Sequence, residues 1–156
     1  MLGTLLYPDG RIGPVAFRNA ALVLIAIGAG LSLTPLLWPS FVLSFISMLL
    51  LYPWAVIWVK RLHDAGKSGW MFLAVLVPWL AVQMTVGWFI SRQFGMATPA
   101  PGTPPAEIFA HAAAQMQVVA IPGTIASVIL ALAVALVVNE ELKSQPGENR
   151  YGSPAQ

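Results

Sequence analysis

The sequence predicts an all-α integral membrane protein, a bundle of four transmembrane helices with both termini in the cytoplasm. Hydrophobic residues make up 58% of the 156 residues and charged residues only 9%, whereas a soluble domain carries about 25% charged residues. Four uncharged apolar stretches follow one another along the chain, each close to the roughly 20 residues that cross a bilayer. The basic residues gather in the segments that would share one side of the membrane.

The four expected spans are residues 19–37, 41–59, 70–90 and 118–138. At a rise of about 1.5 Å per residue, each is long enough to cross an apolar core about 30 Å thick. Each stretch could instead be a buried helix of a soluble protein, but the chain has too few polar residues to cover four of them. We therefore expect one membrane domain over residues 1–156.

The basic residues predict the orientation of the four spans. Of the eight Lys and Arg residues, only Arg92 lies between the third and fourth spans. The other seven lie before the first span, between the second and third, or after the fourth: Arg11, Arg18, Lys60, Arg61, Lys67, Lys143 and Arg150. Cytoplasmic loops carry an excess of Lys and Arg, so both termini and the 60–69 loop are expected in the cytoplasm. No cleavable signal peptide is visible, and the first span is expected to act as the insertion signal.

The joint between the second and third spans, within "VKRLHDAGKSGW", has a specific expected structure. The second helix is expected to continue one or two turns beyond the membrane, which places Arg61 and Asp64 on one face. Gly66 is suited to end that helix in a left-handed conformation. Ser68 is expected to cap the third helix, its hydroxyl accepting from a free amide of the first turn.

Two further features of this joint concern its surroundings. Gly69 permits a close approach of the chain, and Trp70 is expected to anchor the third span at the membrane interface. Lys60, Arg61 and Lys67 lie near a helix N-terminus. They form a candidate anion site, most simply for a lipid phosphate.

The same joint offers little for catalysis. "GKS" is not a phosphate-binding loop, because that motif needs a glycine five positions before Gly66, where Arg61 stands. His63 and Asp64 are neighbours in sequence and point about 100° apart on a helix, so they cannot form a dyad with each other. Nothing in the sequence ties the hydroxyl of Ser68 to His63. We expect no catalytic residues here.

The outer segment, residues 91–117, is expected to differ from the spans. "MATPAPGTPPAE" is rich in proline and should form an extended or irregular loop. "AEIFAHAAAQMQ" indicates a short helix lying on the outer membrane surface or capping the bundle. His111 has no second ligand at suitable spacing, and the chain has no cysteine. No metal, disulfide or cofactor is therefore expected.

The fourth span carries small residues at every fourth position: Gly123, Ser127, Ala131 and Ala135. Such a stripe lets another helix approach closely, either within this chain or between two copies. Pro122 lies inside the same span and is expected to kink it. The polar residues 139–156 then form a cytoplasmic tail.

Three sequence blocks resemble one known family. They are "DGRIGPVAFRNA" (9–20), "RLHDAGKSGW" (61–70) and "GENRYG" (147–152). In this order they are similar to the signature of bacterial inner-membrane proteins known as domain of unknown function 805 (DUF805). The resemblance covers nearly the whole chain and implies a small multi-span bundle in the bacterial inner membrane, with no established activity. Pro14 stands where the family usually has a second arginine, and Arg18 where an aromatic residue is common.

The predicted topology places all three blocks on the cytoplasmic face. The residues expected to meet there, in a folded cytoplasmic cap, are Arg11, Arg61, Asp64, Asn149, Arg150 and Tyr151. We expect Asp64 to pair with Arg11 or Arg150. The alternative is a disordered tail, since residues 139–156 are polar and contain Pro and Gly.

Three classes of function remain open. The first is a non-enzymatic membrane protein, an accessory subunit or scaffold that binds another membrane protein or a second copy of itself. The second is a transporter of a small solute or lipid, although the spans contain no ionisable residue and only Gln83 and hydroxyl groups. The third is an enzyme acting on lipid head groups through His63, Asp64 and Ser68. Membrane lipids, including anionic head groups, are expected partners, and nucleic acid is not, because the net charge is only +2.

Overall fold

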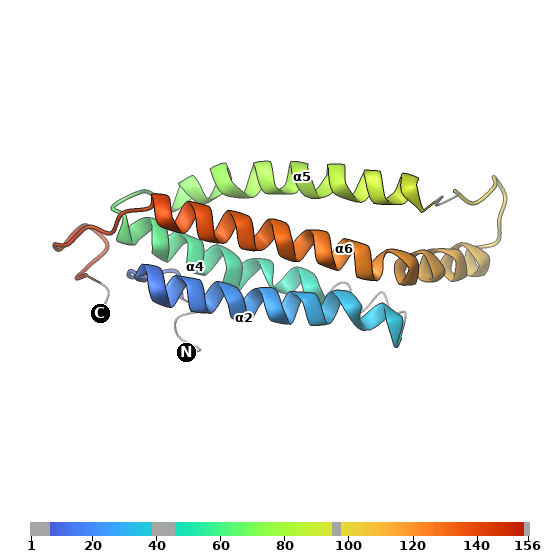
Figure 1. Cartoon of the computed structure of the whole chain (residues 1–156), viewed down its shortest axis with the longest axis horizontal. Helices are drawn as coiled ribbons and strands as arrows, with labels where there is room; N and C mark the ends of the chain where they lie inside the picture. Colours follow the sequence, from blue (N-terminus) through green and yellow to red (C-terminus); the bar gives the residue numbers. More distant parts are fainter. Residues whose placement is uncertain (1–6, 39–45, 95–97, 155–156) are drawn as a thin grey trace.

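The computed structural model describes residues 7–38, 46–94 and 98–154, and in these ranges it is helical without a named strand. Its long helices lie side by side along one axis (Figure 1). They are α2 (Pro14–Leu33), α4 (Leu51–Asp64), α5 (Phe72–Gln93) and α6 (Pro105–Glu141). Two short 3₁₀ helices, η1 (Thr34–Leu36) and η2 (Gly69–Met71), follow α2 and precede α5. The all-helical fold class is confirmed.

Among the described residues, three segments are long and apolar enough to cross a membrane: Pro14–Leu36, Gly69–Gln93 and Pro105–Glu141. They contain the third and fourth expected spans and all of the first except residue 37. The second expected span, 41–59, begins in residues 41–45, which lie outside the described residues. Its described part is helical at 46–49 and continues as α4, which has 14 residues. The structure therefore supports a membrane protein with three candidate spans, and the fourth stays a prediction.

The tightly packed core lies in the half of the bundle where α2 begins and α6 ends. Phe17 and Trp58 meet edge to face in this core, with their ring centroids 4.7 Å apart. The buried cluster comprises Ile12, Phe17, Ala21, Leu24, Ile57, Trp58, Leu62, Ala135 and Leu142. These residues come from α2, α4, α6 and the segments that flank α2 and α6. No residue of α5 is fully buried, so this helix contributes least to the core.

The prediction of a separate short outer helix is wrong, because residues 105–117 belong to the same helix as the fourth expected span. α6 runs without a break over 37 residues. Pro105 occupies its first turn with Glu107, both favourable at a helix N-terminus. The alanine-rich sequence that follows consists of strong helix formers, so nothing ends the helix before the membrane segment.

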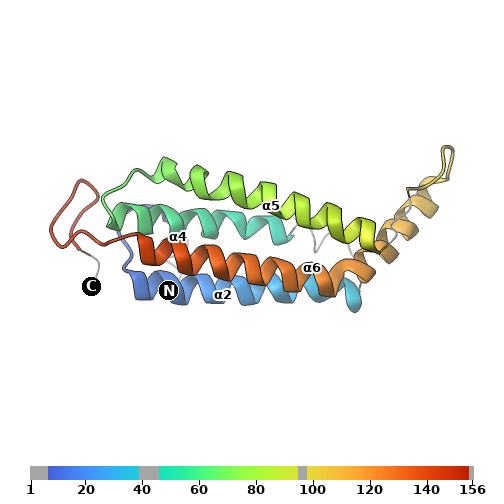
Figure 2. The same ribbon diagram turned by 45° about the horizontal axis from the view of Figure 1, so that its top comes forward.

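Pro122 lies inside α6, and Figure 2 shows the N-terminal part of this helix bending away from the rest of the bundle. A proline removes one backbone hydrogen bond and its ring clashes with the carbonyl four residues earlier, here that of Val118. The bend therefore has an identifiable cause in the sequence.

The small-residue stripe of α6 has two different environments. Ala135, at its C-terminal end, is buried in the core cluster against α2. Ser127 and Ala131 line a cavity between the helices. A Cβ added to Gly123 would meet no heavy atom within 4 Å. The helices are thus closely packed at one end of the stripe and separated at the other.

Candidate functional site

Three segments that are far apart in the sequence meet at one end of the bundle. They are the chain entering α2, the joint between α4 and α5, and the tail after α6, which Figure 1 shows together at the left. We call their meeting point the polar cap. It consists of Arg11, Arg61, His63, Asp64, Asn139, Ser144, Gln145, Asn149 and Tyr151, which are joined by hydrogen bonds, ion pairs and one ring stack.

Asp64 is the centre of the polar cap. Its Oδ1 atom accepts from Arg11 Nε at 3.1 Å and lies 3.0 Å from Arg11 Nη2. Its Oδ2 atom accepts from Arg61 Nη1 at 2.8 Å and from the hydroxyl of Ser144. The three ionised side chains are only 1–2% exposed. Buried charges are tolerated when they are paired and their remaining groups are hydrogen-bonded, and this carboxylate meets both conditions.

The two arginines use their remaining donors on backbone carbonyls of the tail and of the last turn of α6. Arg11 Nη1 donates to Gly147 O at 2.7 Å, and its Nη2 donates to Gln145 O. Arg61 Nη2 donates to the carbonyls of Asn139 and Leu142. Since each guanidinium contacts both Asp64 and the tail, the ion pairs attach the tail to the start of α2 and the end of α4.

Arg61 is held further by the side chain of Asn139. Its Nε donates to Asn139 Oδ1 at 2.7 Å, and Asn139 Nδ2 donates to Pro14 O at 3.2 Å. Burial lowers the pKa of Arg61, and the nearby Asp64 carboxylate partly opposes that effect. A guanidinium has so high an intrinsic pKa that it stays charged in proteins. The Asn139 amide therefore links α6 to α4 through Arg61 and to the first turn of α2 through Pro14 O.

His63 packs against Tyr151 of the tail. The two rings are stacked with centroids 3.7 Å apart and an interplanar angle of 7°. His63 Nδ1 lies 3.3 Å from Gly10 O, and Asn149 Nδ2 donates to His63 O at 3.0 Å. Burial lowers the pKa of His63, which favours the neutral imidazole. The histidine thus joins the N-terminal segment to the tail rather than pairing with Ser68.

Two glycines allow the joint to fold tightly. Gly66 follows α4 with φ +69°, the left-handed conformation expected of it, and its added Cβ would lie 2.3 Å from Gln145 Nε2. At Gly69 an added Cβ would lie 2.9 Å from Val59 Cγ1 and 3.3 Å from His63 Nε2. The close approach expected at Gly69 is therefore with the preceding helix.

The expected capping role of Ser68 is wrong. Ser68 does occupy the position before η2 with an extended backbone, but its side chain makes no capping hydrogen bond. Its backbone carbonyl instead accepts from Met71 N at 3.0 Å. The inserted 3₁₀ turn explains the difference, since its i→i+3 bond uses the Met71 amide, one of the donors that a capping hydroxyl would accept from.

The remaining residues of the joint have different surroundings. Trp70 is 80% exposed and Lys67 is exposed, whereas Lys60 is buried and its carbonyl accepts from Ile12 N at 3.3 Å. Arg61 is turned into the polar cap. A lipid-phosphate site built from these cations stays a prediction, with Arg61 already bound to internal partners.

Of the two partners expected for Asp64, the structure places Arg11 against it. Arg150 lies instead over the ring of Tyr151, 4.7 Å from its centroid. Sequence reasoning did not find Asn139, Ser144 or Gln145. Asn139 offered a signal, as the first polar residue after the fourth span. Gln145 acts mainly through backbone atoms, including Gln145 N to Asp64 O at 2.9 Å, and backbone bonding leaves no side-chain signal.

One protein family matches nearly the whole chain, including every residue of the polar cap. A family model described as "Protein of unknown function (DUF805)" matches residues 11–153. The match begins at the arginine that pairs with Asp64 and ends just beyond the tyrosine that stacks on His63. The chain belongs to the DUF805 family. No curated protein and no solved structure matches it.

In this DUF805 chain the charged groups of the polar cap are bonded to one another. The Asp64 carboxylate has two guanidinium partners and a hydroxyl donor, which leaves it poorly placed to move a proton for a substrate. Among the described residues, no group of three or more His, Cys, Asp or Glu side chains could hold a metal ion. The arrangement can fix three segments together and position α4 relative to α2.

Proposed function

We propose that this DUF805 chain is a non-enzymatic protein of the bacterial inner membrane that binds another membrane protein as an accessory subunit or scaffold. The observation that carries the proposal is the environment of α5. This apolar helix of 22 residues has no fully buried residue. It packs on α6 and, less closely, on α4, and Figure 1 shows it at the edge of the bundle.

One face of α5 presents a continuous row of large apolar side chains. Leu73, Val77, Met84 and Trp88 are 45%, 60%, 76% and 58% exposed. Their spacings of four, seven and four residues place them along one side of a helix. Transmembrane helices associate mainly through van der Waals packing. A long row of this kind therefore suits the transmembrane helix of a partner protein.

The polar cap supports a scaffold rather than an enzyme acting on lipid head groups. That alternative needs His63, Asp64 and Ser68 to act together. In the structure His63 lies against Tyr151 and Gly10, while Asp64 is bound by two arginines. The cap is better suited to holding the bundle in one shape while α5 meets its partner.

The proposed orientation puts the polar cap and both termini in the cytoplasm. Its support is the distribution of charge, because seven of the eight Lys and Arg residues precede the first span, follow the fourth or lie in the joint between the second and third. Arg92, the eighth, lies in the last turn of α5, far from the cap. A reporter fused after Gln156 that is active only in the periplasm should stay inactive, and activity there would reverse the orientation.

Site-specific photocrosslinking in living cells tests the partner. A photoreactive amino acid is placed at Val77 or Met84 of α5 and, as a matched control, at Val23 of α2, which is 44% exposed. We expect a discrete adduct with another membrane protein from α5 and none from Val23. Adducts with lipid alone, or equal adducts from both helices, would remove the support for a partner on α5. An adduct of twice the chain mass would identify a second copy instead.

A further inference from the structure

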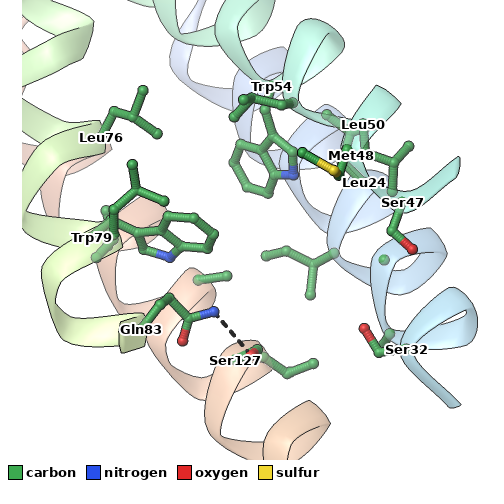
Figure 3. Close-up of a pocket in the computed structure, with 18 of the residues that line it drawn as sticks. Leu24, Ser32, Ser47, Met48, Leu50, Trp54, Leu76, Trp79, Gln83 and Ser127 are labelled. Atoms are coloured by element: carbon green, nitrogen blue, oxygen red, sulfur yellow. Dashed lines mark hydrogen bonds between the residues drawn. The ribbon is translucent and has the colours of Figure 1, made fainter. Parts of the chain in front are cut away.

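A cavity of about 410 Å³ lies between the four long helices, away from the polar cap. Its volume falls within the range of about 300–1,000 Å³ that is typical of ligand sites. Figure 3 shows Trp54 of α4 and Trp79 of α5 on two sides of it, with Leu24 and Leu76 also directed inward. No Asp, Glu, Lys, Arg or His is among the described residues that line it.

A second hollow, of about 330 Å³, adjoins the first on the side away from the cap. Pro35 and Met116 are among its lining residues, from the C-terminal side of α2 and the N-terminal part of α6. Four residues line both spaces, and all four carry hydroxyl groups: Ser32, Ser47, Thr124 and Ser127. The polar groups are thus concentrated where the apolar cavity meets the second hollow.

One of these hydroxyls has no hydrogen-bond partner among the described residues. Thr124 is 8% exposed, and its Oγ1 atom makes no hydrogen bond to any described residue. Burying a hydroxyl without a partner is unfavourable, and most buried polar atoms in native proteins are hydrogen-bonded. Nearby, Gln83 Nε2 donates to Ser127 Oγ at 3.0 Å. Ser127 can therefore still donate its own hydroxyl proton toward the cavity.

We infer that this cavity binds an uncharged amphiphile with one apolar chain and a hydroxyl or carbonyl head. The chain occupies the apolar space between Trp54 and Trp79, and the head bonds Thr124 and Ser127 at its polar end. A charged head is disfavoured because no described residue lining either space carries an opposite charge. A plain hydrocarbon would leave the Thr124 hydroxyl without a partner.

The position of the hydroxyls fixes the direction of binding. Thr124 lies 14 positions before Val138, the last residue of the expected fourth span, which is about 20 Å along a helix. It is only six positions after Val118, the first residue of that span, or about 9 Å. The head group therefore lies nearer the end of the bundle away from the cap, and the chain points toward the cap.

Photolabelling of the full-length protein in detergent tests the inference. The probe is octadecanol with a diazirine in the middle of its chain, used below saturation, and adducts are mapped by mass spectrometry. We expect adducts on cavity-lining peptides of α5 and α6. Thr124→Val should reduce this labelling about fivefold, because it removes one hydrogen bond. Thr85→Val is the matched control, since Thr85 is exposed and bonds Ala81 O of its own helix.

The outcomes separate specific binding from non-specific filling of the cavity. Thr124→Val should keep the thermal stability of the wild type, because it replaces an unpartnered hydroxyl with a methyl group of similar shape. Equal labelling of Thr124→Val and wild type would overturn the inference. Equal labelling by a diazirine octadecane without the hydroxyl would do the same, as would stronger competition by octadecyl phosphate than by octadecanol.

Discussion

The Asp64 side chain joins three segments of this molecule that are far apart in the sequence or belong to different elements. One carboxylate binds a guanidinium from the N-terminal segment, another from α4 and a hydroxyl from the tail. Asp64→Asn would leave two buried guanidinium groups facing a neutral amide. Breaking a buried pair costs about 3–5 kcal/mol, so we expect the tail to detach and to be cleaved by protease much faster.

The control for this substitution is Glu141→Gln, which removes an exposed carboxylate at the end of α6. Limited proteolysis with a label after Gln156 measures both variants. We expect the control to be cleaved at the wild-type rate, within the small effects typical of exposed charges. Unchanged cleavage of Asp64→Asn would show that the ion pairs do not hold the tail.

At the level of single residues, the sequence predicted the charged centre but not its polar surroundings. Arg11 and Asp64 could be expected to lie together because the distribution of basic residues predicts which segments share a side of the membrane. The carbonyls of Asn139, Leu142, Gln145 and Gly147 could not be foreseen. A backbone acceptor is present at every position, and only the path of the chain decides which one an arginine meets.

At the level of elements, the end of α4 depends on the left-handed backbone conformation of one residue, Gly66. Gly66 has φ +69°, and a Cβ there would lie 2.3–2.5 Å from the Gln145 side chain. A left-handed conformation costs a residue with a Cβ about 1–2 kcal/mol, while the flexible Gln145 side chain can move. We expect Gly66→Ala to destabilise the protein by about that amount, measured as a lower midpoint of thermal unfolding.

Gly147→Ala provides the comparison for Gly66→Ala. Gly147 has no positive φ, and an added Cβ there would meet no heavy atom within 4 Å. Its substitution should therefore be nearly neutral. Gly66→Asn should fall between the two variants, because Asn adopts the left-handed region more readily than Ala does. Equal effects at Gly66 and Gly147 would mean that the turn after α4 contributes little.

Hydrophobicity predicted which helices are candidate membrane spans better than where those helices begin and end. The fourth expected span was recognised from its apolar residues, but α6 begins 13 residues earlier, at Pro105 rather than Val118. A hydropathy pattern responds to the bilayer, whereas helix continuity depends on backbone propensity and on the absence of a breaker. The bend at Pro122, in contrast, could be predicted, because a proline inside a helix bends it and can be read directly from the sequence.

At the scale of the whole molecule, the two ends of the bundle differ in how they are held. The polar cap and the buried core occupy one end, whereas the other contains the two hollows and an unpartnered hydroxyl. Closely packed regions open least in native proteins. The end away from the cap is therefore the one that can adapt to a ligand. The cap holds α2, α4 and α6 in fixed positions relative to one another.

We expect the polar cap to respond to pH through His63. Burial lowers its pKa below the ordinary value of 6.5, and the positive charge of Arg150 acts in the same direction. The bond to Gly10 O and the charge of Asp9 oppose the shift. A histidine in a released tail state binds a proton near pH 6.5, before the packed one does. The contribution of His63 to cap stability is thus greatest well above pH 6.5, the ordinary histidine pKa, and decreases as the pH falls through that value.

We expect proteolysis of the tail to accelerate as the pH falls from about 7.5 to about 5, the interval in which a histidine charges. His63→Phe should remove most of this acceleration, because a phenyl ring can still stack on Tyr151 but cannot bind a proton. His111→Gln changes the other histidine of the chain, which lies in the N-terminal part of α6, and should keep the wild-type response. A pH response that survives in His63→Phe would assign the titration to another group in the polar cap.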